Sequence, residues 1–418
     1  MDSMKKKLYF AGLVGEIMEW FDFTVYGFFA LVIASNFFPA ENHFISVIAT
    51  FAAFAIGFLM RPLGGLFFGY IGDKIGRKKV LTTSMFLMAF PSLIIALTPT
   101  FDTIGIFAPI ILILMRMLQG LSVGGEHTGS VIYLTELSSH KDRALSAAVP
   151  FIGTILGVLL GSLVGVMIFS IYSHDTIVEW AWRIPFFLGV FIAVVGIIIR
   201  KYLPESLTSD AKEKVDMPIV DVFKNHLFAF FQVFFLNLTF AVGFYTVFIY
   251  NPIWMHKFLD VSKSYSLEVN SISLVLAIVA IFFSSKYSNI YGRKMMLIIS
   301  TIGLSLFSYP LYDLMLRDEF YYIMFGQGTF AVLIGMFMGV IGVAMVELFT
   351  KNVRMSAVSV AFNLSFAVFG GTAPMVATWL IHTTHDNLSL SWYISLSAFI
   401  SFLVVLTLKE TYKKEVLD

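Results

Sequence analysis

The sequence predicts an all-α membrane protein with twelve transmembrane helices, arranged as two pseudo-symmetric bundles of six. Three observations lead to this prediction: the composition, the spacing of long apolar stretches, and a loop motif that occurs twice. Of the 418 residues, 58% are hydrophobic and only 13% are charged, and the mean hydropathy is +0.85. Soluble domains carry roughly 25% charged residues. A chain this apolar therefore needs lipid around it to cover its surface.

Apolar stretches long enough to cross a bilayer follow one another along the chain. A spanning helix needs about 20 apolar residues. We predict spans at 8–36, 44–70, 80–98, 104–136, 144–171, 182–199, 226–254, 269–285, 295–314, 319–349, 355–382 and 391–408. The longest polar stretch lies between the sixth and seventh spans. It predicts an N-terminal six-helix bundle over 1–199, a cytoplasmic linker over 200–225 and a C-terminal six-helix bundle over 226–418.

The basic residues predict how these spans are oriented. Lys and Arg gather near the N-terminus, in alternate loops and after the last span, whereas the opposite loops hold only Arg183, Lys257, Lys263 and Arg317. Cytoplasmic loops of membrane proteins carry an excess of Lys and Arg. We therefore expect a multi-pass protein of a bacterial-type inner (plasma) membrane, with both termini in the cytoplasm.

Composition also excludes several classes of function. The formal net charge of +1 gives no electrostatic basis for nucleic-acid binding. The chain has no cysteine, which removes thiol catalysis and Cys-based metal sites, and it has no HExxH motif. We therefore expect a protein that is not an enzyme, with no catalytic residue, no metal and no cofactor other than a proton gradient. We also expect a monomer whose surroundings are the lipid bilayer.

A loop motif after the second span occurs again, in altered form, after the eighth. The first copy is Gly69-Tyr-Ile-Gly-Asp-Lys-Ile-Gly-Arg-Lys-Lys79, and the second is Ser285-Lys-Tyr-Ser-Asn-Ile-Tyr-Gly-Arg-Lys294. Matching motifs at equivalent places in two halves predict an internal duplication.

The first copy of the motif predicts a latch on the cytoplasmic side. Gly72 and Gly76 permit a tight turn, and Asp73 can lie at a neighbouring helix N-terminus, where an anion is favoured. Arg77 can pair with a carboxylate at the end of another span, for which Glu136 is the natural candidate. Such a latch would close the cytoplasmic side in one conformation. The alternative is a solvated basic turn that only sets topology.

Several motifs resemble those of a known superfamily of transporters. The loop Gly-x-x-x-Asp-(Lys/Arg)-x-Gly-Arg-(Lys/Arg) is similar to the signature of the major facilitator superfamily. Within it, Glu19–Gly27, Phe58–Gly65 and Gln119–Glu126 look like the metabolite:proton symporters, and Ser122–Gly129 and Ala361–Ser365 are most similar to the proline/betaine transporters. The resemblance implies the major facilitator fold. It also implies proton-coupled import, by alternating access, of a small polar metabolite such as proline or glycine betaine, that is, amino-acid or osmolyte transport.

The resemblance leaves two alternatives open. Phe369–Gly371 also resembles the 2-oxoglutarate and citrate branches, so an organic-acid:proton symporter is the other substrate class. A non-transporting membrane sensor on the same scaffold is an alternative of a different kind.

The sequence departs from the family pattern in two places. Asn289 replaces the acidic residue of the second loop, so we expect no charged latch there. No heptads occur in Lys409–Asp418, so osmotic regulation is not carried over from the resemblance.

Charges inside the spans are concentrated in the N-terminal half. They are Glu16, Glu19, Asp22, Arg61, Arg116 and Glu126. A charge in hydrocarbon costs at least a few kcal/mol and is retained mostly for function. At about 1.5 Å per residue, Glu19, Arg61 and Glu126 share one depth near the middle of the membrane. Asp22, Tyr26 and Arg116 are expected a turn or two further out.

The numbers of buried acids and arginines indicate their roles. Four acids face two arginines, and burial disfavours the charged form of an acid that has no cationic partner. We therefore assign proton coupling to Glu19, Asp22 and Glu126. The same excess of acids favours a zwitterion over a substrate that carries only carboxylates. The alternative is a purely structural network of ion pairs.

Residues on several spans are candidates for substrate binding. Arginine binds carboxylates by charge-assisted hydrogen bonds, and aromatic rings bind cationic nitrogens. The candidates are Arg61, Arg116, Gln119, Phe23, Tyr26, Tyr245, Asn363 and Phe366. We expect His127, next to Glu126, to be a satisfied interior histidine rather than a proton relay.

Overall fold

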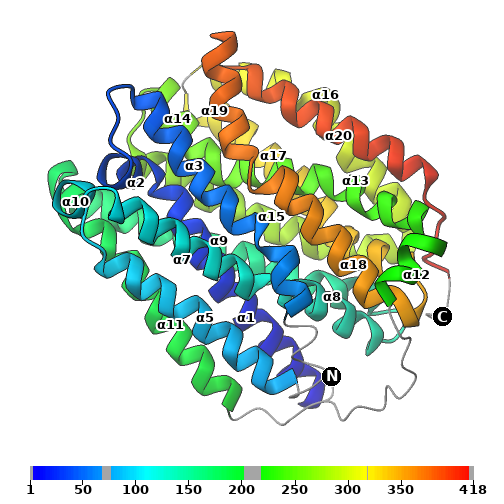
Figure 1. Cartoon of the computed structure of the whole chain (residues 1–418). Helices are drawn as coiled ribbons and strands as arrows, with labels where there is room; N and C mark the ends of the chain where they lie inside the picture. Colours follow the sequence, from blue (N-terminus) through cyan, green and yellow to red (C-terminus); the bar gives the residue numbers. More distant parts are fainter. Residues whose placement is uncertain (1–2, 68–76, 202–217, 318, 414–418) are drawn as a thin grey trace.

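The computed structural model describes residues 3–67, 77–201, 218–317 and 319–413. In this part of the chain it is built of helices, and no strand occurs (Figure 1). Nine of the described helices are long and apolar enough to cross a membrane, one bent pair supplies a tenth, and Phe86–Leu97 and Ala181–Val195 are shorter apolar helices. These correspond one to one to the twelve predicted spans, so the predicted all-α membrane fold is confirmed.

The N-terminal half supplies the first six spans. They are α1 (Ser3–Phe28) with α2 (Ala30–Phe37), α3 (His43–Leu59), α5 (Arg77–Leu97), α7 (Phe107–Val123) with α8 (Glu126–Glu136), α9 (Arg143–Ile171) and α11 (Ile184–Lys201). The second span continues beyond α3 to Phe67. The short elements α6 (Phe101–Ile104), α10 (His174–Glu179) and the 3-10 turn η1 (Ala181–Arg183) connect the spans.

The C-terminal half supplies the other six spans, two of which contain a π-helical segment. The elements are α13 (Leu227–Phe244), π-helix η2 (Tyr245–Tyr250), α14 (Asn251–Phe258), α15 (Lys263–Tyr291), α16 (Arg293–Met315), α17 (Phe320–Glu347), α18 (Lys351–Ser365), π-helix η3 (Phe366–Gly370), α19 (Ala373–Thr384) and α20 (Ser389–Thr407).

Two boundaries differ from the prediction. The eighth span is longer than the predicted 269–285, because the Ser262 side chain caps α15 by accepting a hydrogen bond from the Tyr265 amide. Helix can therefore continue beyond the apolar core that the prediction detected. The predicted linker 200–225 also contains a short helix, α12 (Pro218–Asn225). The division of the chain into two bundles at this linker stays a prediction.

Close helix crossings at glycine bring the buried charges together. A Cβ on Gly157 of α9 would lie 2.6 Å from the Ile17 carbonyl oxygen of α1, and a Cβ on Gly57 of α3 would lie 3.1 Å from the Arg116 carbonyl oxygen of α7. Small residues allow the backbones of membrane helices to approach in this way. Contacts of Glu19 with Arg61 and of Tyr26 with Arg116 in turn place α1 next to the second and fourth spans.

The outward faces of the helices carry large apolar side chains. Phe191, Phe228, Phe307 and Phe325 are each more than half exposed. Side chains of this size and number have to be covered by lipid in a folded protein. The chain is thus a multi-pass membrane protein.

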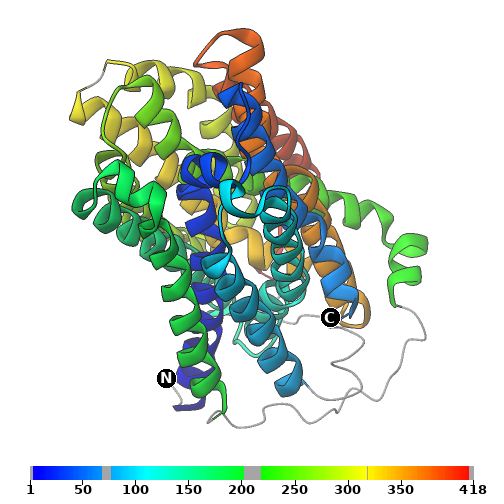
Figure 2. The same ribbon diagram turned by 60° about the vertical axis from the view of Figure 1, so that its left-hand side comes forward.

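The two halves contact each other at both ends of the molecule. At one end, where α1 begins (Figures 1 and 2) and α20 ends (Figure 1), Arg354 Nη1 lies 2.6 Å from Glu136 Oε1 and Arg143 Nη1 lies 3.3 Å from Glu347 Oε1. We call this the terminal end. At the other end, the ring of Phe44 stacks on His382 with centroids 3.7 Å apart.

Candidate functional site

Arg116 of α7 lies at the centre of the molecule and is completely buried. Its Nη1 donates a 2.9 Å hydrogen bond to Gln119 Oε1, and its guanidinium carbon lies 4.3 Å from the ring centre of Tyr26 and 4.6 Å from that of Phe23. The Nε and Nη2 atoms have no hydrogen-bond partner among the described residues. Buried donors without partners are costly, so this guanidinium is prepared to bind an anionic group.

Arg61 of the second span also lies close to the ring of Phe23. Its Nη2 forms a 3.2 Å ion pair with Glu19 Oε1, and its guanidinium carbon lies 4.4 Å from the ring centre of Phe58 and 5.0 Å from that of Phe23. Phe23 therefore contacts both arginines. The difference between them is that Arg61 already has a carboxylate partner in direct contact.

Asp22 of α1 is connected to Arg116 through Gln119. Asp22 Oδ2 accepts hydrogen bonds of 2.5 Å from Ser92 Oγ and of 2.5 Å from Gln119 Nε2. Asp22 Oδ1 has no hydrogen-bond partner in the described part of the chain. Gln119 accepts a hydrogen bond from Arg116 and donates one to Asp22. A change in the charge of the Asp22 carboxylate can therefore affect the Arg116 guanidinium through this single amide.

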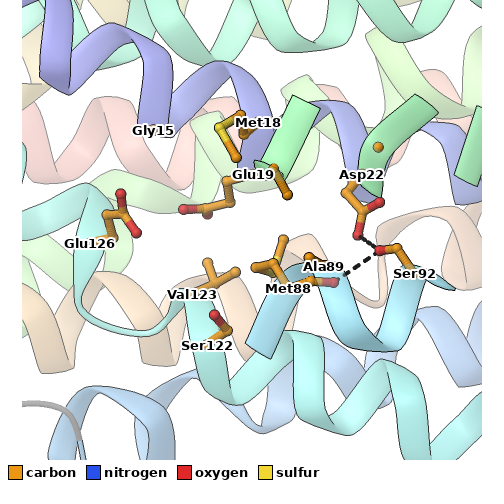
Figure 3. A pocket seen from close by; sticks show the side chains of 12 residues that line it. Gly15, Met18, Glu19, Asp22, Met88, Ala89, Ser92, Ser122, Val123 and Glu126 are labelled. Atoms are coloured by element: carbon orange, nitrogen blue, oxygen red, sulfur yellow. Dashed lines mark hydrogen bonds between the residues drawn. The ribbon is translucent and has the colours of Figure 1, made fainter. Parts of the chain in front are cut away.

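Glu126, at the start of α8, lies in a pocket with Glu19 and Asp22. Figure 3 shows that the Glu19 carboxylate points along the pocket toward Glu126, while Asp22 lies beyond it with Ser92. Glu126 is partly exposed, whereas Glu19 and Asp22 are each 5% exposed. The three acids assigned to proton coupling therefore come from α1 and α8 into one pocket.

The C-terminal half contributes aromatic and amide groups. The ring of Tyr245 in η2 lies with its centre 5.2 Å from that of Phe58 and 6.2 Å from that of Phe366 in η3. The Tyr245 hydroxyl is buried without a partner among the described residues. Asn363 of α18 donates a 2.6 Å hydrogen bond to the Gly124 carbonyl oxygen between α7 and α8. Both π-helical segments thus begin with aromatic rings that lie close to each other, Tyr245 and Phe366, and π-turns often occur at functional sites.

Sequence reasoning did not single out a second buried pair, Glu16 with His127. His127 Nδ1 lies 2.8 Å from Glu16 Oε2, which also accepts from Trp20 Nε1 at 3.1 Å. The imidazole stacks on Phe362 of α18, with centroids 5.0 Å apart. His127 therefore has a carboxylate partner inside the protein.

Sequence reasoning also missed Phe54, Phe58 and Ser92. The spacing of Phe54, Phe58 and Arg61, at steps of four and three, places them on one helical face, and this signal was available. No comparable signal exists for Ser92, because its contact with Asp22 depends on how α5 packs against α1.

The predicted latch is only partly within the described residues. Gly72, Asp73 and Gly76 lie outside them, as does the side chain of Arg77. Glu136, the expected partner of Arg77, pairs with Arg354 of the C-terminal half. Asn289 also contacts the opposite half, because its Nδ2 donates a 2.8 Å hydrogen bond to the Lys141 carbonyl oxygen.

The structure offers no evident metal centre in its described ranges, since no group of three or more His, Asp or Glu side chains there is placed to hold an ion. The site instead holds two guanidinium groups, of which Arg116 has two nitrogens and Arg61 one nitrogen without a partner among the described residues, together with a row of carboxylates and several aromatic rings. This combination can bind an organic ion and exchange protons.

Comparison with known proteins identifies the family. Residues 8–220 match the family described as "Sugar (and other) transporter". The chain is 35% identical to a putative proline/betaine transporter of Staphylococcus aureus (strain MSSA476) over 97% of this chain and 88% of that protein. It is 33% identical to the proline/betaine transporter of Salmonella typhimurium, over 98% of this chain and 84% of that protein.

Solved structures share the fold at low sequence identity. The xylose transporter XylE from E. coli, in a partially occluded inward-open conformation, superposes with a TM-score of 0.80 at 17% identity, over 99% of this chain and all of that one. A D-xylose-proton symporter gives a TM-score of 0.75 at 18% identity, over 98% and 97% of the two chains. The chain therefore belongs to the major facilitator superfamily, in the sugar (and other) transporter family and in the same group as the proline/betaine transporters.

Proposed function

We propose that this protein is a proton-coupled symporter that imports a small zwitterion, such as proline or glycine betaine, by alternating access. The observation that carries this proposal is Arg116, a buried guanidinium with two nitrogens, Nε and Nη2, that have no partner among the described residues, and with aromatic rings beside it. The relatives' names support the substrate class, since both curated relatives are called proline/betaine transporters.

The charge balance of the site favours a substrate with one carboxylate. Arg61 is paired directly with Glu19, whereas Arg116 reaches Asp22 only through Gln119. One guanidinium is therefore available for a ligand, and it can bind a single carboxylate through its paired donors. A dicarboxylate would need a second cation that is not already neutralised.

Aromatic rings suit the other end of a zwitterion. Tyr245 packs against Phe54 and Phe58 of the second span and against Phe366 of η3. A quaternary or secondary ammonium group is attracted to the faces of such rings, by about 2 kcal/mol or more when desolvated. A zwitterion held between Arg116 and these rings would contact both halves of the protein and could therefore favour a closed state.

Proton coupling is proposed for Asp22, with Glu19 and Glu126. When Asp22 is charged, it attracts Gln119, which in turn holds Arg116. Protonation of Asp22 removes that attraction and frees Arg116 to bind a substrate carboxylate. Proton binding and substrate binding would then support each other, which is the thermodynamic requirement for symport.

The contacts at the terminal end support a closed cytoplasmic gate. Taking both termini as cytoplasmic, the pairs Glu136–Arg354 and Arg143–Glu347 join the two halves across the inner side. The loop with Gly72, Asp73, Gly76 and Arg77 would add to this latch. We further propose that the protein works as a monomer of two six-helix bundles and needs no cofactor.

Uptake into vesicles that contain the purified protein tests the proposal. Labelled proline, glycine betaine, 2-oxoglutarate and citrate are supplied with and without an inward pH gradient. We expect gradient-driven accumulation of a zwitterion that is lost when a protonophore is added. Uptake of the dicarboxylate alone would replace the proposal with the organic-acid alternative. Absence of any transport would favour a sensor.

A further inference from the structure

We propose that the N-terminal half contains a separate side route by which the coupling proton travels between Asp22 and the cytoplasm, without passing through the substrate site. This inference rests on the proposed function, in which Asp22 exchanges that proton. The route is the pocket shown in Figure 3, which we call the acidic side pocket. It is lined by Gly15, Met18, Glu19, Asp22, Met88, Ala89, Ser92, Ser122, Val123, Glu126, Gly189 and Ala193.

The acidic side pocket lies within one half of the protein. Its lining residues come from α1, α5, α7, α8 and α11, and every one of them precedes residue 200. The proposed substrate groups Arg61, Arg116 and Tyr245 do not line it. Asp22 therefore lines the side pocket with its own side chain and is linked to Arg116 through Gln119.

Carboxylates follow one another along the pocket. Figure 3 shows Glu126, Glu19 and Asp22 in this order. Glu126 is partly exposed and Asp22 is 5% exposed, so the row leads from the surface to the interior. The row runs toward the terminal end, because α1 begins there and carries Glu19 before Asp22.

One oxygen of Asp22 lies at the wall of this pocket without a hydrogen-bond partner among the described residues. Ser92 and Gln119 both donate to Oδ2, whereas Oδ1 is buried without a hydrogen-bond partner in the described ranges. A Cβ added to Gly189, a residue that lines the pocket, would lie 2.8 Å from Oδ1. The unpartnered oxygen thus lies against Gly189, at the wall of the pocket, and in this proposal it is the atom where a proton would bind.

The proton transfer needs only water from the cytoplasm. The O–H bond at Asp22 Oδ1 breaks as a bond to a water oxygen forms in the pocket, and the carboxylate retains the negative charge. Glu19 and Glu126 then accept and release the proton in turn toward the exposed end. Apolar side chains such as Met18, Met88 and Val123 line the pocket beside the carboxylates, so the passage suits water and protons rather than an organic zwitterion.

Filling the pocket tests the route. Ala193→Leu on α11 places a large side chain in the pocket, and Val194→Leu is the matched control, because Val194 is 47% exposed on the outer face of the same helix. Vesicles with each variant are assayed for accumulation of labelled proline or glycine betaine under a pH gradient, and for counterflow exchange of the same compound at equal pH. We expect Ala193→Leu to lose accumulation and to retain exchange, and Val194→Leu to retain both.

A second variant tests the route independently of whether Ala193→Leu folds correctly. The chain has no cysteine, so Ala89→Cys creates a unique thiol in the pocket that can be blocked with benzyl methanethiosulfonate after the protein has folded. Loss of accumulation on labelling, with exchange intact, supports the route. Equal loss of accumulation and exchange, or full labelling that leaves accumulation unchanged, overturns it. Failure of the proposed function is recognised separately, since the unmodified protein would then show no gradient-driven accumulation.

Discussion

The two halves of this transporter bury different kinds of polar group. The interior of the N-terminal half holds ions, with Glu19 paired to Arg61 and Asp22 linked to Arg116 through Gln119. The C-terminal half instead buries a cluster of neutral amides. Asn251 Nδ2 donates a 2.5 Å hydrogen bond to Gln327 Oε1, and Gln327 Nε2 donates one of 3.2 Å to Asn270 Oδ1.

This difference suits the two halves to different tasks, holding helices together and binding protons. Amides hydrogen-bond in the same way whether or not a proton is available, so the cluster of Asn251, Gln327 and Asn270 can hold helices together throughout a transport cycle. Carboxylates change their charge when they bind a proton. The buried charges of the C-terminal half, Arg293, Glu347 and Arg354, lie at helix ends on the terminal end, where they suit a gate.

The largest effect is expected at Arg116, where the contrast between the two halves predicts a loss of substrate binding. Arg116→Gln removes charge-assisted hydrogen bonds of up to about 3 kcal/mol, which corresponds to roughly 100-fold weaker binding. Arg116→Lys should retain weak binding, since the charge remains but the paired donors are lost. Uptake and exchange of labelled zwitterion measure both variants, with the exposed Arg317→Gln as control. Unchanged affinity in Arg116→Gln would move the carboxylate site elsewhere.

A smaller and more selective effect is expected at Asp22. Asp22→Asn fixes the site in a neutral form, so accumulation under a pH gradient should be lost while counterflow exchange continues, because exchange needs no proton release. The control is Glu268→Gln, the same kind of change at an exposed acid of α15. If Asp22→Asn accumulates substrate like the unmodified protein, Asp22 is structural, and the contrast between the halves loses its functional meaning.

In the C-terminal half, the contrast between the two halves predicts that a substitution lowers the stability of the protein and leaves proton coupling unchanged. Gln327→Leu leaves the amide of Asn251 without its partner, and a buried polar group left unpaired costs about 1–3 kcal/mol. The melting temperature in detergent should fall, whereas the ratio of accumulation to exchange should not change. A coupling defect in Gln327→Leu at normal stability would show that the amide cluster takes part in proton transfer.

The smallest effect is expected at the gate. Glu136→Gln weakens the pair with Arg354, but the Glu136 side chain is 32% exposed, and ion pairs in contact with water are worth about 1 kcal/mol or less. A modest increase in labelling of a single cysteine on the inner side should report more open molecules. A change as large as that of Arg116→Gln would mean that this pair controls the cycle on its own.

Much of this arrangement could be predicted from the sequence, because depth along a helix follows from counting residues. Equal depth placed Glu19 near Arg61, and a shared level further out placed Tyr26 near Arg116, as the distances of 3.2 and 4.3 Å show. The roles assigned to these residues stay predictions.

Contacts that depend on packing between distant helices could not be predicted. In the sequence, Arg354 cannot be distinguished from the other basic residues of the inner loops. Its contact with Glu136 depends on the fold. The acidic side pocket depends on the small side chains of Ala89, Gly189 and Ala193, and small residues in a membrane helix indicate close packing equally well.

The π-helical segments η2 and η3 have a mechanical consequence. In each, an amide bonds to the carbonyl oxygen five residues earlier, as Gly371 does to Phe366 at 2.9 Å. This wider turn is a common point of helix bending, because its hydrogen bonds can shift by one residue without any segment unfolding. Both segments border the proposed substrate site, and no charged side chain lies in either of them. The C-terminal half can therefore bend at these two segments during transport, whereas the buried ion pair between Glu19 and Arg61 holds the helices of the N-terminal half together.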